Sequence, residues 1–424
     1  MNVVQPKKKP LKNLATINDN SLTENTNPEW EVKYIDIGNV NSRGEINDIQ
    51  TYRFADAPSR ARRIVSDGDV IISTVRTYLQ AIAPIKSPPD NLIVSTGFAV
   101  IRPRLDQLDA DYCKYALREA EFLHEVVARS VGISYPAINT SDLGNIPIYI
   151  HSLSEQKAIA HYLDKETAKI DQLIEAKKRL LELLDEKRRA LITHAVTRGL
   201  NPDVPMRDSG VEWIGEIPKH WSIQRLKTVS RSLQIGPFGS QLHAEDYVDD
   251  GIPVINPVHL VDGKIIPNYQ VAVDQETAKR LSIYQLENGD VVFARRGEIG
   301  RCGVVTQEEV GWLCGSGSLR VRPNLESLDP EYLVLLVSHT SVGKSLSMMS
   351  VGTTMENLNT QIISDLRIPL PPLSEQSYLV SEIKDKVCQL NSLKTITEQT
   401  IKLLEERRIA LISSTVTGQL KIKE

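Results

Sequence analysis

The chain has 424 residues, a formal net charge of −4, a hydrophobic fraction of 41% and four cysteines. This length predicts two to four domains with ample core, and the composition is typical of a soluble globular protein. The slightly negative charge excludes a global electrostatic attraction to nucleic acid, so any such binding needs local basic patches. No apolar run approaches the roughly 18 residues of a membrane span. The cysteines are scattered without C-x-x-C spacing, which argues against zinc and disulfides and predicts a cytoplasmic protein.

The N-terminal lysines, Lys7 to Lys9, have no apolar segment beside them, so the start of the chain does not resemble a secretory signal. They form either a solvated tail or an arm that contacts phosphate. Residues 1 to about 152 then alternate short β-rich runs with turns. Strands are expected at 30–38, 69–75 and 92–102, with a turn at 41–44.

One helix is expected at 110–127, because Asp109 can cap it and its apolar residues lie close to one stripe. A loop at 130–136 and a short strand at 144–150 complete this first β-rich region.

A long helix is predicted from residue 153, because no Pro or Gly occurs before Gly199. About 45 helical residues would extend roughly 67 Å, which suggests a coiled coil. Leu153 and Ser154 supply a hydrophobic staple and an N-cap. The expected apolar seam follows spacings of three and four residues, with interruptions, at Leu163, Ile170, Leu173, Leu180, Leu184 and Leu191.

The long segment recurs 220 residues later without a gap, so that Leu153-Ser154-Glu155-Gln156 returns as Leu373-Ser374-Glu375-Gln376. The β-rich regions repeat as well, since Arg102-Pro103 returns as Arg322-Pro323. The predicted fold is α/β (α+β), with two similar heads held apart by two long helices in an antiparallel coiled coil of pseudo-two-fold symmetry. The expected domains are heads at 1–152 and 201–372, the second with its connector, and helices at 153–200 and 373–424, the second with its tail.

Three features accompany the repeat. LSEQ follows a short Pro-containing strand, an E-K/R-R-x-A-L-I run ends each long segment, and SGVEWIGEIPKHW precedes the second head. Together with the half-repeat, they closely resemble the specificity (S) subunit of type I restriction–modification systems over nearly the whole chain. One departure from the family is that the S-G-x-E-W-I-G-x-I-P lead-in precedes only the second head.

The resemblance implies that each head reads one half of a bipartite sequence in double-stranded DNA. The long helices would bind two modification (methyltransferase) subunits, and the restriction subunits would join that core. S-adenosylmethionine, ATP and Mg²⁺ would belong to those partners, so the chain itself needs no cofactor.

The sequence offers no catalytic motif. The N/D-P-P-Y/F motif and the Gly-rich cofactor loop of an adenine methyltransferase are missing, as is an H-E-x-x-H metal site. Gly343-Lys344-Ser345 imitates the end of a P-loop, but Ser338 stands where its first glycine belongs. The chain is therefore expected to be a non-catalytic subunit. The alternatives are a self-contained methyltransferase or nuclease with divergent motifs, and a coiled-coil assembly protein.

Candidate DNA contacts are polar side chains in loops that leave the β-rich cores, because base edges and phosphates are bound by such groups. Each is equally compatible with a solvated surface. In the first head the candidates are Arg60, Arg62, Arg63, Arg76, Tyr78, Tyr135 and Asn139. In the second head they are Ser240, Gln241, Arg295, Arg296, Arg301, Thr353, Thr354 and Asn357. The glycines around Arg295 to Arg301 would allow close approach to a phosphate backbone.

The long helices carry more apolar residues than one seam needs. The residues expected to bind partner subunits are Ile174, Leu181, Leu183 and Leu403. This surplus predicts helical partners, unless the heads cover the same surface.

Overall fold

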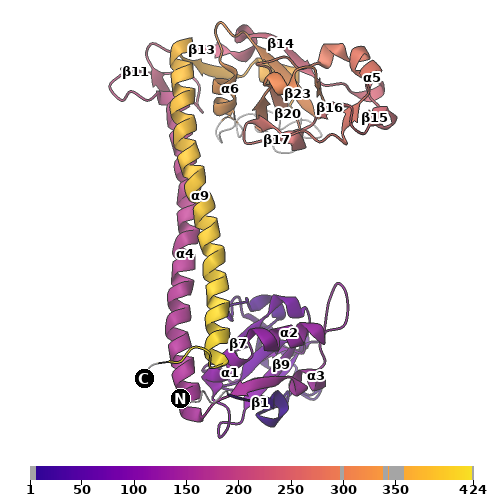
Figure 1. The fold of residues 1–424 in the computed structure, drawn as a ribbon, viewed down its shortest axis with the longest axis vertical. Helices are drawn as coiled ribbons and strands as arrows, with labels where there is room; N and C mark the ends of the chain where they lie inside the picture. Colours follow the sequence, from indigo (N-terminus) through magenta and orange to yellow (C-terminus); the bar gives the residue numbers. More distant parts are fainter. Residues whose placement is uncertain (1–5, 297–299, 338–341, 343–357, 423–424) are drawn as a thin grey trace. The chain divides into compact units, whose positions relative to one another are not determined.

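The computed structural model describes residues 6–296, 300–337, 342 and 358–422. The chain forms two compact units (Figure 1), one of Met1–Lys178 with Glu398–Glu424 and the other of Arg179–Thr397. In the part of the chain that the structure describes, no helix is both long and apolar enough to cross a membrane.

The first head contains two four-stranded sheets, one antiparallel and one mixed. One has the order β2 (Ala15–Ile17), β9 (Phe98–Pro103), β6 (Val70–Ser73) and β7 (Ile82–Pro84). The other has the order β4 (Gln50–Arg53), β3 (Glu31–Ile35), β8 (Leu92–Ser95) and β5 (Ala61–Ile64), with β3 and β8 parallel. A separate ribbon joins β1 (Lys7–Pro10) to β10 (Pro147–Ile150), so the N-terminal lysines that the structure describes lie in a strand.

Two predicted elements of this head are each divided in two. The strand expected at 92–102 is β8 and β9, separated by a turn. The helix expected at 110–127 is α1 (Ala110–Ala116) and α2 (Ala120–Ala128). Asp109 caps α1, as predicted, by accepting a hydrogen bond from the Tyr112 amide at 3.0 Å. Glu119 is the N-cap of α2, because its carboxylate accepts from the Glu121 and Phe122 amides. Its backbone is extended, so α1 ends before it.

The two long helices are α4 (Leu153–Arg198) and α9 (Leu373–Val416). The N-cap of α4 is Ser152 rather than the predicted Ser154. The Ser152 hydroxyl accepts from the Glu155 amide at 3.3 Å, and the Glu155 carboxylate accepts from the Ser152 amide at 3.0 Å. This reciprocal pair is a capping box, which outcompetes a cap two residues later.

The prediction that α4 and α9 pack antiparallel is confirmed within each unit (Figure 1). In the first unit Asp171 of α4 pairs with Arg408 of α9, and in the second unit Asp185 pairs with Lys394. An advance of 14 residues along α4 is therefore matched by a retreat of 14 residues along α9.

The seam differs from the predicted one at two positions. Thr167 and Ile174 are buried, while Leu173 (45% exposed) and Leu180 (37% exposed) lie outside the pair. Regular steps of four and three from Leu163 lead to Thr167, Ile170, Ile174, Lys177, Leu181 and Leu184. The predicted seam also alternates steps of three and four residues, but it takes the step of three first, which shifts Leu173 and Leu180 into it in place of Ile174 and Leu181.

The second head repeats the first in its sheets. One sheet has the order β14 (Ser230–Ile235), β23 (Ser318–Pro323), β20 (Val291–Ala294) and β21 (Cys302–Val304). Another has the order β15 (Tyr247–Val248), β19 (Ala272–Val273), β16 (Ile252–Ile255) and β22 (Leu313–Cys314). Smaller ribbons join β11 (Met206–Asp208) to β12 (Glu216–Pro218), β13 (Ser222–Arg225) to β24 (Arg367–Leu370), and β17 (Leu260–Val261) to β18 (Lys264–Ile265).

Short helices complete both heads: α3 (Thr140–Asn145) in the first, and α5 (Gln275–Arg280), α6 (Pro330–Val337) and α8 (Thr360–Ser364) in the second. The connector before the second head packs on the end of α4, where Ile217 and Trp221 share a core with Ile192 and Val196.

The glutamine of each LSEQ motif joins a head to its long helix. The Gln156 carbonyl accepts from the Asp109 amide at 2.8 Å, and its amide donates to the carbonyls of Gln107 and His151. Gln376 makes the equivalent bonds to Asp329, Ser327 and Pro371. Both glutamines are fully buried, so the motif recurs because it satisfies the same three backbone groups twice.

A buried ion pair also recurs inside each head. Arg102 binds both carboxylate oxygens of Asp69, at 2.8 and 2.9 Å, and Arg322 does the same to Asp290. Such bidentate pairs fix the relative position of two strands with high geometric specificity.

Candidate nucleic-acid interface

The end of strand β6 organises the candidate residues of the first head. The Thr74 amide donates to the Gly97 carbonyl at 2.8 Å, and the Thr74 carbonyl accepts from the Ile138 amide at 2.9 Å. Val75 forms a bridge with Ala137. These contacts hold the loop at 130–137 beside the residues that follow β6.

Three predicted residues meet at this edge. Arg76 adopts a left-handed backbone conformation (φ 52°), and its guanidinium lies 4.9 Å from the centre of the Tyr135 ring. Tyr78 and Tyr135 are both more than half exposed. Ile133, at the tip of the same loop, is fully exposed and was missed, because a single apolar residue in a loop gives no signal of its own in the sequence. We call Arg76, Tyr78, Ile133 and Tyr135 the first reading edge.

The basic cluster at 60–63 lies across the start of strand β5. Arg60 is exposed, and its backbone carbonyl accepts from the Thr96 amide. Thr96 precedes Gly97, whose carbonyl binds the Thr74 amide. Arg62 lies over the Phe54 ring at 4.7 Å, and the Nε of Arg63 is buried. Arg60, which precedes β5, is therefore the most accessible of the three.

Asn139 has a structural task. Its carbonyl accepts from the Asp142 amide at 2.7 Å and caps α3, and its amide donates to the Asp142 carboxylate. Asn359 caps α8 in the same way. The side-chain carbonyl that would bind a base is thus already engaged in an N-cap.

The second head repeats the backbone frame with different side chains. The Arg295 amide donates to the Gly317 carbonyl at 2.9 Å, and its carbonyl accepts from the Leu358 amide at 3.0 Å, as at Thr74. The Arg295 guanidinium donates to the Leu358 and Ser316 carbonyls. Burial lowers its pKa, helped by the nearby charge of Arg296. Arg295 therefore fastens two loops together, whereas Arg296 and Arg301 expose their side chains.

The loop after β14 begins beside this frame. A Cβ atom at Gly236 would lie 2.0 Å from the Gly315 carbonyl oxygen. The absence of a side chain therefore lets these two loops pack closely. Ser240 is exposed. The side-chain carbonyl of Gln241 accepts from the Tyr284 hydroxyl at 2.9 Å. The predicted contacts Thr353, Thr354 and Asn357 lie outside the described residues.

The candidate partner residues are divided by the helix pair. Ile174 is 1% exposed and packs against Leu404 in the seam, and Leu181 is half-buried at another seam position. Ile174 therefore stabilises the helix pair and does not belong to a free surface. Leu183 (45% exposed) and Leu403 (64% exposed) do face outward. The prediction misplaced Ile174 because it set the seam one residue early.

The described residues contain no group of three or more His, Cys, Asp or Glu side chains that could hold a metal ion. Three of the four cysteines are buried, and burial raises the pKa of Cys314 to about 12. What these heads present is a set of exposed arginines, aromatic rings and loop amides, which suits non-covalent binding of nucleic acid.

A model of the family "Type I restriction modification DNA specificity domain" matches residues 5–183 and 218–406. The chain belongs to this family of type I restriction–modification specificity subunits. It is 23% identical over 335 residues to the MjaVIII specificity subunit of Methanocaldococcus jannaschii, which covers 78% of this chain and 75% of the relative. It is 21% identical over 303 residues to the EcoBI specificity subunit of Escherichia coli, with 70% and 64% covered.

Solved structures share the fold. A chain from a study of complex assembly and conformational transition of the type I R-M system matches with a TM-score of 0.81 at 22% identity, covering 98% of this chain and 99% of its own. The HsdS subunit from Thermoanaerobacter tengcongensis matches with a TM-score of 0.59 at 22% identity, with 98% and 97% covered.

The resemblance noted in the sequence is thereby confirmed. As a specificity subunit, the chain determines DNA recognition within a type I restriction–modification complex and is a non-catalytic component of that enzyme.

Proposed function

We propose that each head reads one half of a bipartite sequence in double-stranded DNA, through the loops that follow β6 in the first head and β20 in the second. The observation that carries this proposal is the repeated frame at Thr74 and Arg295. The backbone bonds are the same in both heads, but the side chains they present differ. A common scaffold with different side chains suits two readers of different sequences.

Within the first head, the first reading edge is the proposed contact surface, with Arg60 beside it. Exposed tyrosines can stack or hydrogen-bond at the DNA, and an arginine can bind guanine or phosphate. Asn139 is not part of this surface, because its side chain caps α3. In the second head we assign the contacts to Ser240, Arg296 and Arg301, and we assign Arg295 a positioning role.

The long helices are the proposed docking surface for two modification subunits. Leu180 and Leu183 of α4, with Leu393 and Ile396 of α9, are exposed apolar residues of the second unit. Leu173 and Leu403 are their counterparts in the first unit, since Leu173 matches Leu393 and Leu183 matches Leu403 in the 220-residue repeat. Apolar side chains three and seven residues apart share one side of a helix, which suits a helical partner.

Two related surfaces, which share Leu173/Leu393 and Leu183/Leu403, support two copies of the same partner, with the restriction subunits joining that core. S-adenosylmethionine, ATP and Mg²⁺ would be supplied by those subunits, which work on DNA in the cytoplasm. The proposed domains are 1–152 and 201–372 for the heads, and 153–200 and 373–424 for the helices.

A head exchange tests this proposal. Residues 1–152 are replaced by the first head of another specificity subunit, the chimera is expressed with its modification subunits, and the methylated sites of the genome are mapped. We expect one half-site to change and the other to stay. If both half-sites changed, the assignment of one half-site to each head would be wrong. Purified chain incubated alone with S-adenosylmethionine should methylate nothing; methylation there would favour the self-contained enzyme.

A further inference from the structure

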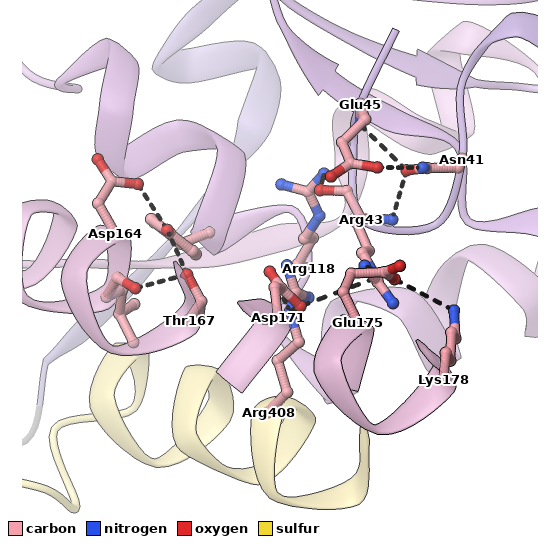
Figure 2. Close-up of polar contacts among 12 residues, drawn as sticks. Asn41, Arg43, Glu45, Arg118, Asp164, Thr167, Asp171, Glu175, Lys178 and Arg408 are labelled. Carbon is pink, nitrogen blue, oxygen red and sulfur yellow. Dashed lines mark hydrogen bonds and ion pairs between the residues drawn. The ribbon is translucent and has the colours of Figure 1, made fainter. Parts of the chain in front are cut away.

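Charged side chains connect the first head to both long helices (Figure 2). The turn that ends at Gly44 leaves the head and brings Arg43 to α4, where Asp171 also meets Arg408 of α9. We call Arg43, Arg118, Asp171, Glu175 and Arg408 the junction cluster. All five residues belong to the first compact unit.

Asp171 is the centre of the cluster. Its carboxylate lies 3.0 Å from Nε of Arg408 and 3.8 Å from Nε of Arg43, whose Nη1 lies 2.9 Å from Glu175. The side chains of Arg43, Asp171 and Arg408 are only 14–23% exposed. Solvent screens such pairs less than surface pairs, so their charges attract one another more strongly than those of an exposed ion pair.

Arg118 fastens the same turn to the head. It is buried and donates to the Arg43 carbonyl at 3.0 Å and to the Ile82 carbonyl of β7. Burial, followed by the neighbouring Arg408, lowers its pKa to about 10. Gly44 has a φ of +86°, and a side chain there would overlap the Arg118 guanidinium. The turn is therefore fixed to the sheet on one side and to the helices on the other.

The junction cluster lies farther along the helices than the contacts at the base of the head. Leu163 of α4, with Ile412 and Val416 of α9, packs into the core of the first head. Asp171 lies eight residues beyond Leu163, which is about 12 Å along a helix. Polar contacts of the head with Asp164 and Thr167 of α4 also lie on the base side of Asp171, so the junction cluster holds the head at a greater distance from that base. A displacement of ~1 Å over a lever of ~12 Å is a tilt of about 5°.

The second half replaces this network with a different one. In the 220-residue repeat Asn391 stands where Asp171 is, and the second turn ends at Gly263 (φ +79°) as the first ends at Gly44. Its turn instead places Asp262 at 3.7 Å from Arg188, the match of Arg408. In the first half the turn carries the positive charge and α4 the negative one, whereas in the second half the turn carries the negative charge and α4 the positive one. Asp262 is largely exposed.

We infer that the junction cluster fixes the tilt of the first head on its helices and thereby limits which spacer lengths between the two half-sites the complex accepts. The inference rests on the proposed function, because a spacer exists only if the heads read half-sites. A shift of one base pair moves a half-site by ~3.4 Å, a distance that a freely tilting head can absorb and a fixed head cannot.

The first experiment measures the tilt directly in the free subunit. Spin labels are placed at Glu24→Cys on the head and Lys165→Cys on α4, in a Cys388→Ser background that removes the exposed native thiol. We expect a narrow distance distribution in this parent, and a broad one after Arg43→Ala or Asp171→Asn. Arg53→Ala is the matched control, because it removes an exposed ion pair with Asp56 on the same head. Unchanged widths in both junction variants would overturn the inference.

The second experiment measures spacer selectivity in the complex with its modification subunits. Methylation rates are compared on duplexes with the native spacer and with one base pair added or removed. We expect Arg43→Ala and Asp171→Asn each to lower the native preference about fivefold, the factor that corresponds to ~1 kcal/mol, with Arg53→Ala unchanged. A wild-type complex with no sequence preference would refute the proposed function. A wild-type preference that both junction variants retain would refute this inference alone.

Discussion

The LSEQ glutamine is the residue whose removal tests the head–helix connection most directly. Gln156 is fully buried and binds three backbone groups: the Asp109 amide at 2.8 Å, the Gln107 carbonyl at 3.0 Å and the His151 carbonyl at 2.9 Å. Gln156→Ala removes all three bonds at once and leaves their partners facing a small cavity. We expect the first unit to lose stability, because these groups cannot reach solvent without local opening.

The expected cost follows from the three bonds. A buried polar group left unsatisfied costs about 1–3 kcal/mol, so the three partners together predict a loss of at least about 3 kcal/mol. Gln376 makes the equivalent three bonds, and Gln376→Ala should cost the second unit a similar amount.

Urea unfolding of the specificity subunit checks this value, with Gln172→Ala as the matched control because Gln172 is exposed on the same helix. Hydrogen exchange adds a local measurement, since the Asp109 amide should lose protection. A stability loss within ~0.5 kcal/mol of the control, the range of ordinary surface substitutions, would show that the bonds do not hold the head on α4.

A charged replacement should make the same site pH-dependent. Gln156→Glu would place a carboxylate oxygen against two carbonyls, and burial would raise the pKa of the new carboxyl above its unfolded value of about 4.3. A raised folded-state pKa means that stability is retained at low pH and lost as the pH rises through that pKa. The melting temperature of Gln156→Glu should therefore fall between pH 5 and pH 8 relative to wild type; an equal loss at both pH values would contradict this.

Two other predictions concern surfaces. The double variant Leu183→Glu, Leu403→Glu should weaken binding of the modification subunits at least tenfold without lowering thermal stability. Leu105→Glu, on an exposed loop of the first head, should change neither binding nor stability. Co-purification checks this, and unchanged binding of the double variant would place the partners elsewhere. Lys8 donates to Glu121 and, with Tyr149, holds the pKa of that carboxyl below its usual value of 4.5. The pairing of β1 with β10 should thus be supported above pH 4.5 and lose this support as the pH falls through the folded-state pKa. An NMR titration in which Glu121 shows an ordinary pKa, or in which Lys8→Ala leaves it unmoved, would exclude that role.

The sequence was most informative where residues repeat. The 220-residue repeat predicted two related heads. It also predicted an antiparallel pair of helices, because a long helix with an apolar stripe and no other long partner packs on its own repeat. Asp109 as a helix cap followed from local backbone chemistry, which needs only neighbouring residues. Arg76, Tyr78 and Tyr135 were selected because each stands where a loop leaves a β-rich core; the structure brings them to one edge, and their contact with DNA stays a prediction.

The sequence was less informative wherever two segments compete for the same residues. It could not show that Glu119 would begin a second helix, or that Ser152 would outcompete Ser154 as the cap. It placed the seam at Leu173 because Leu173 and Ile174 are both apolar and steps of three and four residues can pass through either, whereas the structure buries Ile174. Asn139 looked like a base reader because the sequence does not reveal that its side-chain carbonyl already caps α3.

The sequence by itself therefore determined the architecture, the family and the absence of familiar catalytic motifs, since these depend on patterns that are periodic or repeated along the chain. Only the tertiary structure decided which side of each helix is free, which arginines are accessible and which are fasteners, and how Arg43, Asp171 and Arg408 come together. Those three residues are separated by 128 and 237 positions in the chain. Their contact is set by the register of two helices and the direction of one turn, and no local pattern encodes either.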